Sequence, residues 1–361
     1  EQHLAAQHSK GRLSAAQREQ ARARLQPTLD WADLGRADLL IEAVWENMAA
    51  KEEVLRQMDA SARPGAILAS NTSMLDLNHL ARVTQRPHDV VGLHFFSPVP
   101  LMRLLEVVRG QATAPDVLAS AMALAKRLGK TAVLAGVCDG FIGNRMVEHY
   151  LRHAGLLLDE GCTPAQIDHA LEDFGFAMGP FRMSDLSGND IGWAVRQRRA
   201  AEGSSMRFSA TADLLCAQGR WGQKSAAGWY DYAPGSHQAQ PSATVQALLD
   251  THRRSLGRAP RSFSDADIVQ RLVLSLVNEG ARLLQEGIAS RASDIDVVYV
   301  LGYGFPLHRG GPMHYAQELG LAEVVRRLEH LAHTDPEDAA FWQPAPLLQR
   351  LAAQGQGFAD L

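Results

Sequence analysis

One histidine and one glutamate, twelve positions apart, are the residues best placed to do chemistry in this chain. His94 ends an apolar run with the pattern of a β-strand, and a turn stiffened by Pro98 and Pro100 follows it. Glu106 lies in a second apolar run, residues 104–108. A strand, a tight turn and a second strand bring the chain back beside itself, so the Glu106 carboxylate can reach the His94 ring. A carboxylate that holds one imidazole nitrogen fixes the tautomer and leaves the other nitrogen to act as a general base near neutral pH.

The segments that would position this pair alternate between strand-like and helix-like patterns. Short apolar runs typical of buried strands occupy residues 38–44, 66–70, 90–95, 104–108 and 131–134. Amphipathic windows typical of helices occupy residues 48–60, 77–83 and 116–128. Strands that alternate with helices predict βαβ units and a mainly parallel sheet. From Phe141 onward the pattern is almost entirely helical.

The helical part contains one sequence pattern twice. An apolar helix leads to an Ile-Asp pair, a Gly-Phe pair and a Gly-Pro pair, in the same order and with spacings that differ by a few residues. The first copy contains Asn144-Arg145-Met146, Ile167-Asp168, Gly175-Phe176 and Gly179-Pro180, and the second contains Gln270-Arg271-Leu272, Ile295-Asp296, Gly304-Phe305 and Gly311-Pro312. Two copies of one helical unit are the simplest interpretation.

Between the two copies, residues 232–241 are rich in Pro, Gly, Ser and Gln, which is typical of a linker. We therefore predict three parts. Residues 1–135 form an α/β domain, residues 136–236 a helical domain, and residues 237–361 a second helical domain like the first.

Size and composition are those of an ordinary globular chain. It has 361 residues, of which 46% are hydrophobic and 21% charged, and a net charge of −4. This balance provides no electrostatic basis for binding nucleic acid or an anionic membrane. Three scattered cysteines without a CxxC pair favour a reducing compartment, and no apolar run approaches the roughly 20 residues of a membrane span. Because neither end carries a recognisable signal, we expect a cytoplasmic protein.

Six motifs resemble the 3-hydroxyacyl-CoA dehydrogenase family, and they follow one another in the family's order. They are residues 41–47 (IEAVWEN), 70–73 (SNTS), 94–98 (HFFSP), 140–145 (GFIGNR), 178–180 (MGP) and 222–224 (GQK). Ser97, where the single-function enzymes carry asparagine, and the second helical copy resemble the dehydrogenase part of a fatty-acid oxidation multifunctional enzyme. The resemblance implies an N-terminally incomplete, Rossmann-like α/β domain followed by two similar all-α domains of the dehydrogenase C-terminal type.

The resemblance also implies an activity, the NAD-dependent oxidation of an L-3-hydroxyacyl-CoA to a 3-ketoacyl-CoA in fatty-acid β-oxidation. His94 would be the base and Glu106 its orienting partner. Ser73 would hydrogen-bond the substrate oxygen, and Asn144, at the start of the first long helix, would help to hold the same oxygen. The residues implied at the NAD site are Ala43, Glu46, Lys51, Ser73, Ser97 and Lys224. The implied partners are the acyl-CoA substrate and, as possibilities, a thiolase and a second copy of the chain.

The chain departs from the family at its N-terminal side. The family begins with a strand, a glycine-rich GxGxxG turn that seats the pyrophosphate, and a helix. No GxGxxG occurs here: the nearest match, Gly302-Tyr303-Gly304, has Leu307 at the third position. Residues 1–36 read instead as a polar helix and a loop. We therefore expect a fragment without the first βαβ unit, in which a central strand position of the sheet is empty and strand edges favour self-association.

Two other functions stay open. The chain could be a catalytically silent fragment, or a structural or interaction subunit of a β-oxidation complex, without a functional NAD site. It could also be a related dehydrogenase that acts on a different β-hydroxy acid. NAD binding and activity on CoA thioesters would separate these alternatives.

Several site residues also have a purely structural interpretation. Asn71 and Ser73 could form a turn and a helix cap ahead of Leu75. Asn144 could be only a helix cap, and Lys224 only a surface lysine.

Other polar residues have no assigned chemistry. His149 and His153 have the i, i+4 spacing of a zinc pair, but no third ligand stands at a recognisable spacing, so we expect no metal site. The two Gly-Pro pairs are typical of tight turns at helix entries. Asp294, Asp296 and Glu286 are typical of caps and surface charges.

Overall fold

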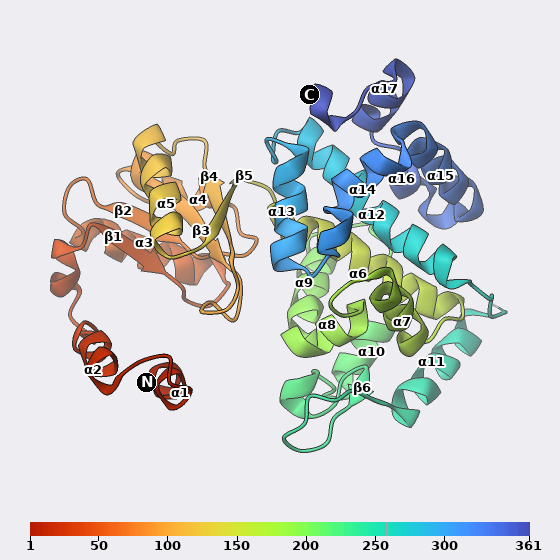
Figure 1. Cartoon of the computed structure of the whole chain (residues 1–361), viewed down its shortest axis with the longest axis horizontal. Coiled ribbons are helices and arrows are strands. Elements are labelled where there is room, and N and C mark those ends of the chain that lie inside the picture. Colours follow the sequence, from red (N-terminus) through yellow and green to blue (C-terminus); the bar gives the residue numbers. More distant parts are fainter. Residues whose placement is uncertain (258) are drawn as a thin grey trace.

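The computed structural model describes residues 1–257 and 259–361. The chain forms an α/β domain and a larger helical part that lie side by side, joined where the last strand of the sheet leads into the first long helix (Figure 1). Within these residues, every helix is too short or too polar to cross a bilayer.

The α/β domain is built on a five-stranded sheet whose strands follow one another in chain order. The strands are β1 (Leu39–Glu42), β2 (Ile67–Ser70), β3 (Val90–Phe95), β4 (Leu104–Arg109) and β5 (Thr131–Gly136). Neighbours are parallel except β3 and β4, which run antiparallel on either side of a turn. The mainly parallel sheet and the strand–turn–strand unit that carries His94 are thus confirmed.

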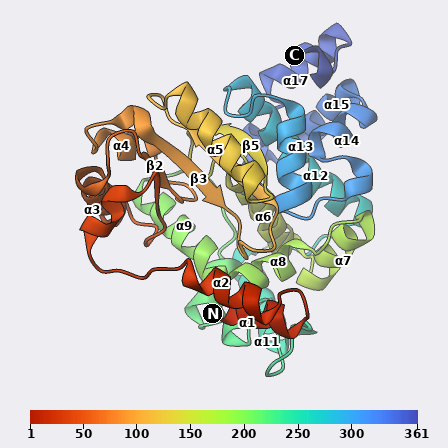
Figure 2. The same ribbon diagram turned by 60° about the vertical axis from the view of Figure 1, so that its left-hand side comes forward.

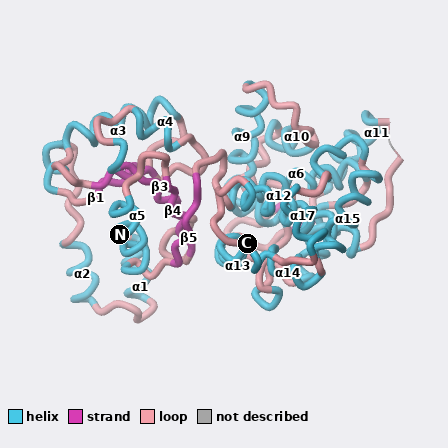
Figure 3. Tube along the Cα trace, turned by 90° about the horizontal axis from the view of Figure 1, so that it is seen from above, coloured by secondary structure: helices cyan, strands magenta, loops and turns pink. Residues whose placement is uncertain are grey.

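Helices cover both faces of this sheet because its strands are apolar on both sides. α3 (Met48–Ser61) and α4 (Leu77–Arg82) lie on one face, and α5 (Pro115–Arg127) lies on the other (Figure 3). Along β3, Val90 packs into the core on the α3 side, whereas Val91 packs into the core on the α5 side. Successive residues of the strand therefore point to opposite faces, as strand geometry requires.

The open position in the sheet is an edge and not the centre. Each strand bonds to its chain neighbour, and among the described residues β1 bonds only to β2. The expected empty position therefore lies at an edge and not at the centre, because the five strands pair in chain order as one continuous sheet, and the expected exposed strand edge is present at β1. The edge left open is that of β1, where Ile41 is 44% exposed.

The N-terminal segment is polar and helical, as predicted. α1 (Gln2–Ser9), α2 (Ala15–Ala23) and the 3-10 helix η1 (Trp31–Arg36) contain no buried residue. Figures 1 and 2 show α1 and α2 lying apart from the sheet. Within this segment, Leu34 of η1 is half-buried and packs against the core.

The helical part has the same order of helices twice. The first series is α6 (Gly143–Glu160), α7 (Pro164–Phe174), α8 (Pro180–Ser187) and α9 (Asn189–Ala201), followed by α10 (Thr211–Ala217) and α11 (Ala243–Leu256). The second series is α12 (Asp265–Gln285), α13 (Ala292–Gly302), α14 (Pro312–Leu319) and α15 (Leu321–Thr334), followed by α16 (Ala339–Trp342) and α17 (Pro346–Gln354). The predicted linker is more ordered than expected, because β6 (Tyr230–Asp231) pairs antiparallel with β7 (Gln240–Pro241).

Both Gly-Pro pairs start a helix, and each start is capped by a buried aspartate. Asp168 accepts hydrogen bonds from the N–H groups of the first turn of α8, and Asp296 does the same for α14. A Cβ on Gly179 would lie 2.2 Å from the Asp168 Cα, and one on Gly311 would lie 2.3 Å from the Asp296 Oδ1. Glycine is therefore required for each aspartate to approach its helix.

The long helices α6 and α12 pack on each other at the centre of the helical part. Arg145 on α6 pairs with Glu286 beyond the end of α12 at 2.6 Å, and Arg271 on α12 pairs with Glu160 at the end of α6 at 2.7 Å. Arg145 and Arg271 occupy the same place in the repeated pattern. The two pairs are thus reciprocal, as in a two-fold symmetric interface in which residue i contacts j and j contacts i.

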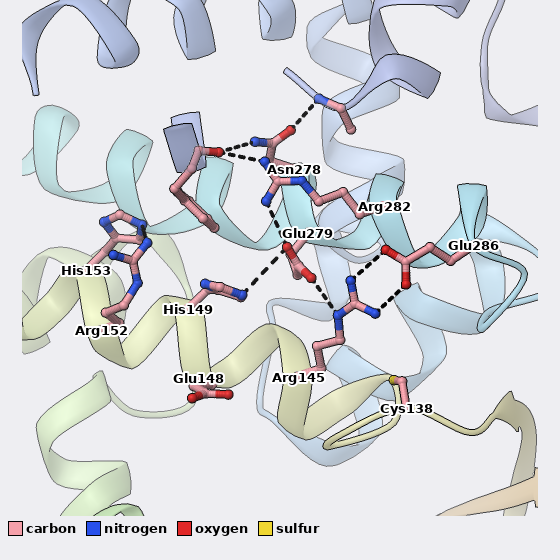
Figure 4. Close-up of polar contacts among 12 residues, drawn as sticks. Cys138, Arg145, Glu148, His149, Arg152, His153, Asn278, Glu279, Arg282 and Glu286 are labelled. Carbon is pink, nitrogen blue, oxygen red and sulfur yellow. Dashed lines mark hydrogen bonds and ion pairs between the residues drawn. The ribbon is translucent and has the colours of Figure 1, made fainter. Parts of the chain in front are cut away.

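Between these helices lie the two histidines considered as a zinc pair. Figure 4 shows His149 directed at Glu279, with Nε2 to Oε2 at 3.7 Å. His153 is buried against Phe341 and Trp342. Burial lowers the pKa of His149 to about 3, so its ring is neutral at neutral pH.

Candidate active site

His94 and Glu106 face each other across the antiparallel pair of strands. They are direct partners in the register of β3 and β4. The His94 Nδ1 lies 2.7 Å from the Glu106 Oε2, and the two residues are 5% and 0% exposed. The contact predicted from their spacing is present, and it is shielded from water.

The second oxygen of Glu106 is also occupied. Oε1 accepts hydrogen bonds from the N–H groups of Ile142 and Gly143, at 3.2 and 3.0 Å. These groups lie at the N-terminus of α6, where unpaired N–H groups and the helix dipole favour a negative charge. One carboxylate therefore orients the His94 ring and fastens the helical part to the α/β domain.

Two aromatic rings lie beside the His94 ring. The centroid of Phe96 is 4.6 Å from that of His94, and the centroid of Phe141 is 5.9 Å away. The His94 Nε2 has no hydrogen-bond partner among the described residues. That nitrogen is the one left to exchange a proton with a ligand.

A loop after β2 brings Ser73 to the site. The Ser73 N–H donates to the Glu46 Oε1 at 2.8 Å, and the Met74 N–H donates to the same atom at 3.2 Å. The hydroxyl of Thr72 also donates to Glu46. Glu46 thus shapes the loop, while the Ser73 hydroxyl has no partner among the residues described.

Asn144 joins the two domains at this loop. It is the second residue of α6, and its Nδ2 donates to the Ser73 carbonyl at 3.2 Å. Its Oδ1 accepts from the Tyr303 hydroxyl at 2.8 Å. The N-cap of α6 is Ile142, and the helix has no side-chain cap. The interpretation of Asn144 as only a helix cap is therefore wrong.

The alternative of a cap at Asn71 and Ser73 is also wrong. The Asn71 Oδ1 accepts from the Phe95 N–H at 2.9 Å, and this bond ties the loop to the end of β3. The N–H of Leu75 donates to Thr72, and α4 is capped by Asp76. The Ser73 side chain therefore caps neither the turn nor α4.

The six residues predicted at the NAD site have different surroundings. Ala43 follows β1, Ser97 follows the residue after β3, and both are exposed. Lys51 is 1% exposed, and its ammonium pairs with Glu42 at 2.9 Å and with Glu46 at 3.4 Å. Lys51 therefore supports the Glu46 that shapes the Ser73 loop, and its direct contact with a cofactor stays a prediction.

Lys224 lies apart from this group. It sits in η3 (Gln223–Ser225), and its Nζ pairs with the Asp190 Oδ1 at 2.5 Å, at the start of α9. Its side chain is 48% exposed. The structure does not bring Lys224 into hydrogen-bond contact with Ser73, His94 or Asn144, so its role at the cofactor also stays a prediction.

Three residues of the site were missed in the sequence. Glu42 is buried at the end of β1 and holds Lys51, and Thr72 forms the turn before Met74. Both lie inside motifs that the sequence displays. Tyr303 reaches Asn144 from 159 positions away, and no local pattern signals a contact between such distant residues.

Comparison with known proteins agrees with this geometry. Residues 1–138 match the family model for the NAD-binding domain of 3-hydroxyacyl-CoA dehydrogenase. Residues 140–232 and 268–357 each match the model for the C-terminal domain. The same domain type thus occurs twice, whereas the predicted boundaries at residues 135 and 236 stay predictions.

Among curated proteins, the chain is similar to the peroxisomal bifunctional enzymes of Danio rerio and Homo sapiens, with 48% identity over 341 residues and 42% over 336 residues. These alignments cover 91% and 90% of this chain and 47% and 46% of those proteins. A fatty acid oxidation complex subunit alpha from Pseudomonas syringae is 36% identical over 97% of this chain and 48% of its own length. The chain therefore spans about half the length of the curated relatives it matches.

Solved structures share the fold. A 3-hydroxybutyryl-CoA dehydrogenase from Escherichia coli has a TM-score of 0.83 at 27% identity, covering 98% of this chain and 89% of that one. The dehydrogenase part of multifunctional enzyme 1 from C. elegans has a TM-score of 0.67 at 30% identity, covering 96% and 79%. The α/β domain is accordingly Rossmann-like, and the chain belongs to the 3-hydroxyacyl-CoA dehydrogenase family.

Proposed function

We propose that the protein oxidises L-3-hydroxyacyl-CoA to 3-ketoacyl-CoA with NAD, as a step of fatty-acid β-oxidation. The observation that carries the proposal is the His94–Glu106 pair. It is a shielded imidazole with one nitrogen held by a carboxylate and the other free, beside the Ser73 and Asn144 side chains. Membership of the family supports the same activity.

The residues present fit the nicotinamide end of NAD. The carboxyl ends of β1, β2 and β3 lie next to one another, which is where open α/β sheets bind ligands. They present the small apolar Ala43, the carboxylate of Glu46, and the hydroxyls of Ser73 and Ser97. When bound there, NAD supplies the acceptor for the hydride that leaves carbon 3 of the substrate.

The chain's own residues would accept the proton and hydrogen-bond the substrate oxygen. The His94 Nε2 takes the proton of the 3-hydroxyl group. Glu106 accepts the hydrogen bond from the Nδ1–H group throughout the reaction, which maintains the tautomer and stabilises the protonated ring. The hydroxyl of Ser73 and the second N–H of the Asn144 amide donate to the oxygen as it becomes a carbonyl.

The proposal extends to partners and compartment. The Pseudomonas relative is by its name a subunit of a fatty acid oxidation complex. On that basis we propose that this protein works beside a thiolase, which would consume the 3-ketoacyl-CoA. We also propose that two copies of the chain form a homodimer. The three cysteines are free thiols, which supports a reducing compartment, and we propose the cytoplasm. A tagged full-length protein found in peroxisomes would overturn the proposed compartment.

The test is NADH oxidation with acetoacetyl-CoA by the full-length natural protein and by its His94→Gln variant. We expect kcat to fall by about 10²- to 10⁴-fold, the usual contribution of a general base. His88→Gln is the matched control, because its side chain is 62% exposed and paired only with Asp89 among the described residues. Near-full activity in His94→Gln would refute the base.

The same assay separates the alternatives. Turnover of free 3-hydroxy acids with none of CoA thioesters would indicate a dehydrogenase for another β-hydroxy acid. A folded wild-type protein that neither binds NAD nor turns over would favour the silent structural or interaction subunit.

A further inference from the structure

The second helical copy places one side chain against the active site. Tyr303 directly follows α13, and its hydroxyl lies 2.8 Å from the Asn144 Oδ1. The other end of the same amide, Nδ2, lies 3.2 Å from the Ser73 carbonyl. A carbonyl oxygen can only accept, so the NH₂ group of Asn144 must face Ser73 and its oxygen must face the phenol, which donates.

Tyr303 is held firmly in this position. Its ring stacks on Tyr299 at a centroid distance of 4.9 Å and meets the ring of Phe96 edge-on at 5.7 Å. The Tyr299 hydroxyl donates to the Gly143 carbonyl at 3.2 Å. A Cβ on Gly143 would lie 2.5 Å from the Tyr303 ring, so only glycine allows the ring this close to α6.

The residue after Asn144 is fixed by the same copy. Figure 4 shows Arg145 reaching both Glu279 and Glu286, with Nε to Glu279 Oε1 at 2.6 Å and Nη1 to Glu286 Oε2 at 2.6 Å. Gly143, Asn144 and Arg145 therefore each contact the second copy. The first turn of α6 also donates to Glu106. This turn is therefore held by residues of the second helical copy.

We propose that Tyr303 is a positioning residue for the dehydrogenase reaction: its hydroxyl fixes the Asn144 amide so that its N–H groups face Ser73 and the substrate oxygen. The second helical copy thereby completes an active site whose reacting groups all lie in the other two domains. This inference rests on the proposed function, because it gives Asn144 a role toward the substrate oxygen.

The experiment compares Tyr303→Phe with the wild type in the full-length protein. The variant keeps the ring and its packing and loses only the hydroxyl. We expect kcat with acetoacetyl-CoA to fall about five- to tenfold, the worth of one hydrogen bond, with the KM for NADH unchanged. Tyr230→Phe is the control, because it removes another buried hydroxyl, which donates to Asp168 at 2.7 Å and lies outside the site. It should leave kcat unchanged.

A double-mutant cycle with Asn144→Ala identifies the path of the effect. If Tyr303 acts through Asn144, Tyr303→Phe has no further effect on kcat once Asn144 is alanine. Losses that multiply in the double variant would overturn the inference, as would an unchanged kcat in Tyr303→Phe.

Unfolding of the same four proteins provides a readout that needs no activity. A measurable coupling free energy between positions 144 and 303 supports the contact, and its absence overturns it. Full activity in Asn144→Ala would instead refute the proposed role of Asn144, and a wild type without turnover would refute the proposed function, so the failures are distinguishable.

Discussion

The first helical copy, residues 140–232, and the second, residues 268–357, use the same devices to hold their helices and have different duties at the site. Asp168 and Asp296 cap equivalent helices next to equivalent Gly-Pro turns. Arg145 and Arg271 make reciprocal ion pairs across α6 and α12. At the position before these arginines, however, the first copy has Asn144 and the second has Gln270.

The two residues at that position have different contacts. Asn144 meets Ser73 beside His94, whereas Gln270 has no hydrogen bond to any described residue of the site. The second copy contributes Tyr303 instead, from a different helix. The two copies thus share their packing, but only the first has an asparagine at the Ser73 loop. Four comparisons between equivalent residues test the proposed division of roles.

The largest effect is expected from the reciprocal arginines. Arg271→Ala removes one partner of Glu160, which keeps Arg261, and one partner of Asp335, which keeps Arg207. Arg145→Ala removes one partner of the buried Glu279, which keeps Arg282, and the arginine that pairs with the exposed Glu286. Removing one partner of a buried pair costs about 3–5 kcal/mol. Urea unfolding should show losses of this size for both variants, and kcat should fall only for Arg145→Ala.

The control is Arg326→Ala, whose partner Glu323 is on the same exposed helix face. It should leave the unfolding midpoint nearly unchanged. A loss below about 1 kcal/mol in Arg271→Ala would show that the two pairs are not equivalent supports.

The next largest effect is on kcat, which we expect to change only for a substitution in the first copy. Asn144→Ala removes one donor to the substrate oxygen, and such a loss lowers kcat by about 10²-fold or more. Gln270→Ala should leave kcat and KM unchanged. Steady-state kinetics of both variants check this, and a rate defect in Gln270→Ala would mean that the second copy takes part in chemistry by another route.

Local patterns account for what could be predicted from the sequence. His94 and Glu106 were found because a tight turn joins neighbouring strands, and contacts over twelve positions follow from strand register. The strands, the long helices and the repeat follow from apolar spacing and recurring pairs. Membership of the family came from six short motifs in order.

What could not be predicted depends on long-range packing. The open edge at β1 depends on which strands pair, and an apolar run does not determine its neighbour. The burial of Lys51 against Glu42 depends on how α3 crosses the end of β1. The contact of Tyr303 with Asn144 requires that both copies be folded and docked.

A smaller effect should distinguish the two Gly-Pro turns. Gly179 has φ −73°, an ordinary value, whereas Gly311 has φ +122°, which side chains rarely adopt. Alanine at either position collides with its aspartate, at about 1–3 kcal/mol, and Gly311→Ala adds the cost of backbone strain. Gly320→Ala isolates that strain, because φ is +88° there and nothing lies within 4 Å of the added Cβ. Equal losses of Tm in Gly179→Ala and Gly311→Ala would contradict this ranking.

The smallest effect is a difference in pH dependence between the two capping aspartates. Burial raises the pKa of Asp168 to about 7 and that of Asp296 to about 6, from an ordinary value of 3.8. Between pH 3.8 and the raised pKa, the folded protein binds a proton that the unfolded chain has lost, so stability falls as pH rises through this window.

An asparagine does not titrate, so the Tm advantage of the wild type over Asp168→Asn should shrink as pH rises to about 7. For Asp296→Asn the same decline should end near pH 6, because Asp296 is 9% exposed whereas Asp168 is only 1% exposed, so burial raises the pKa of Asp296 less. Calorimetric scans from about pH 4 to about pH 8 cover both declines. An advantage that grows with pH would mean that the caps are ionised in the fold.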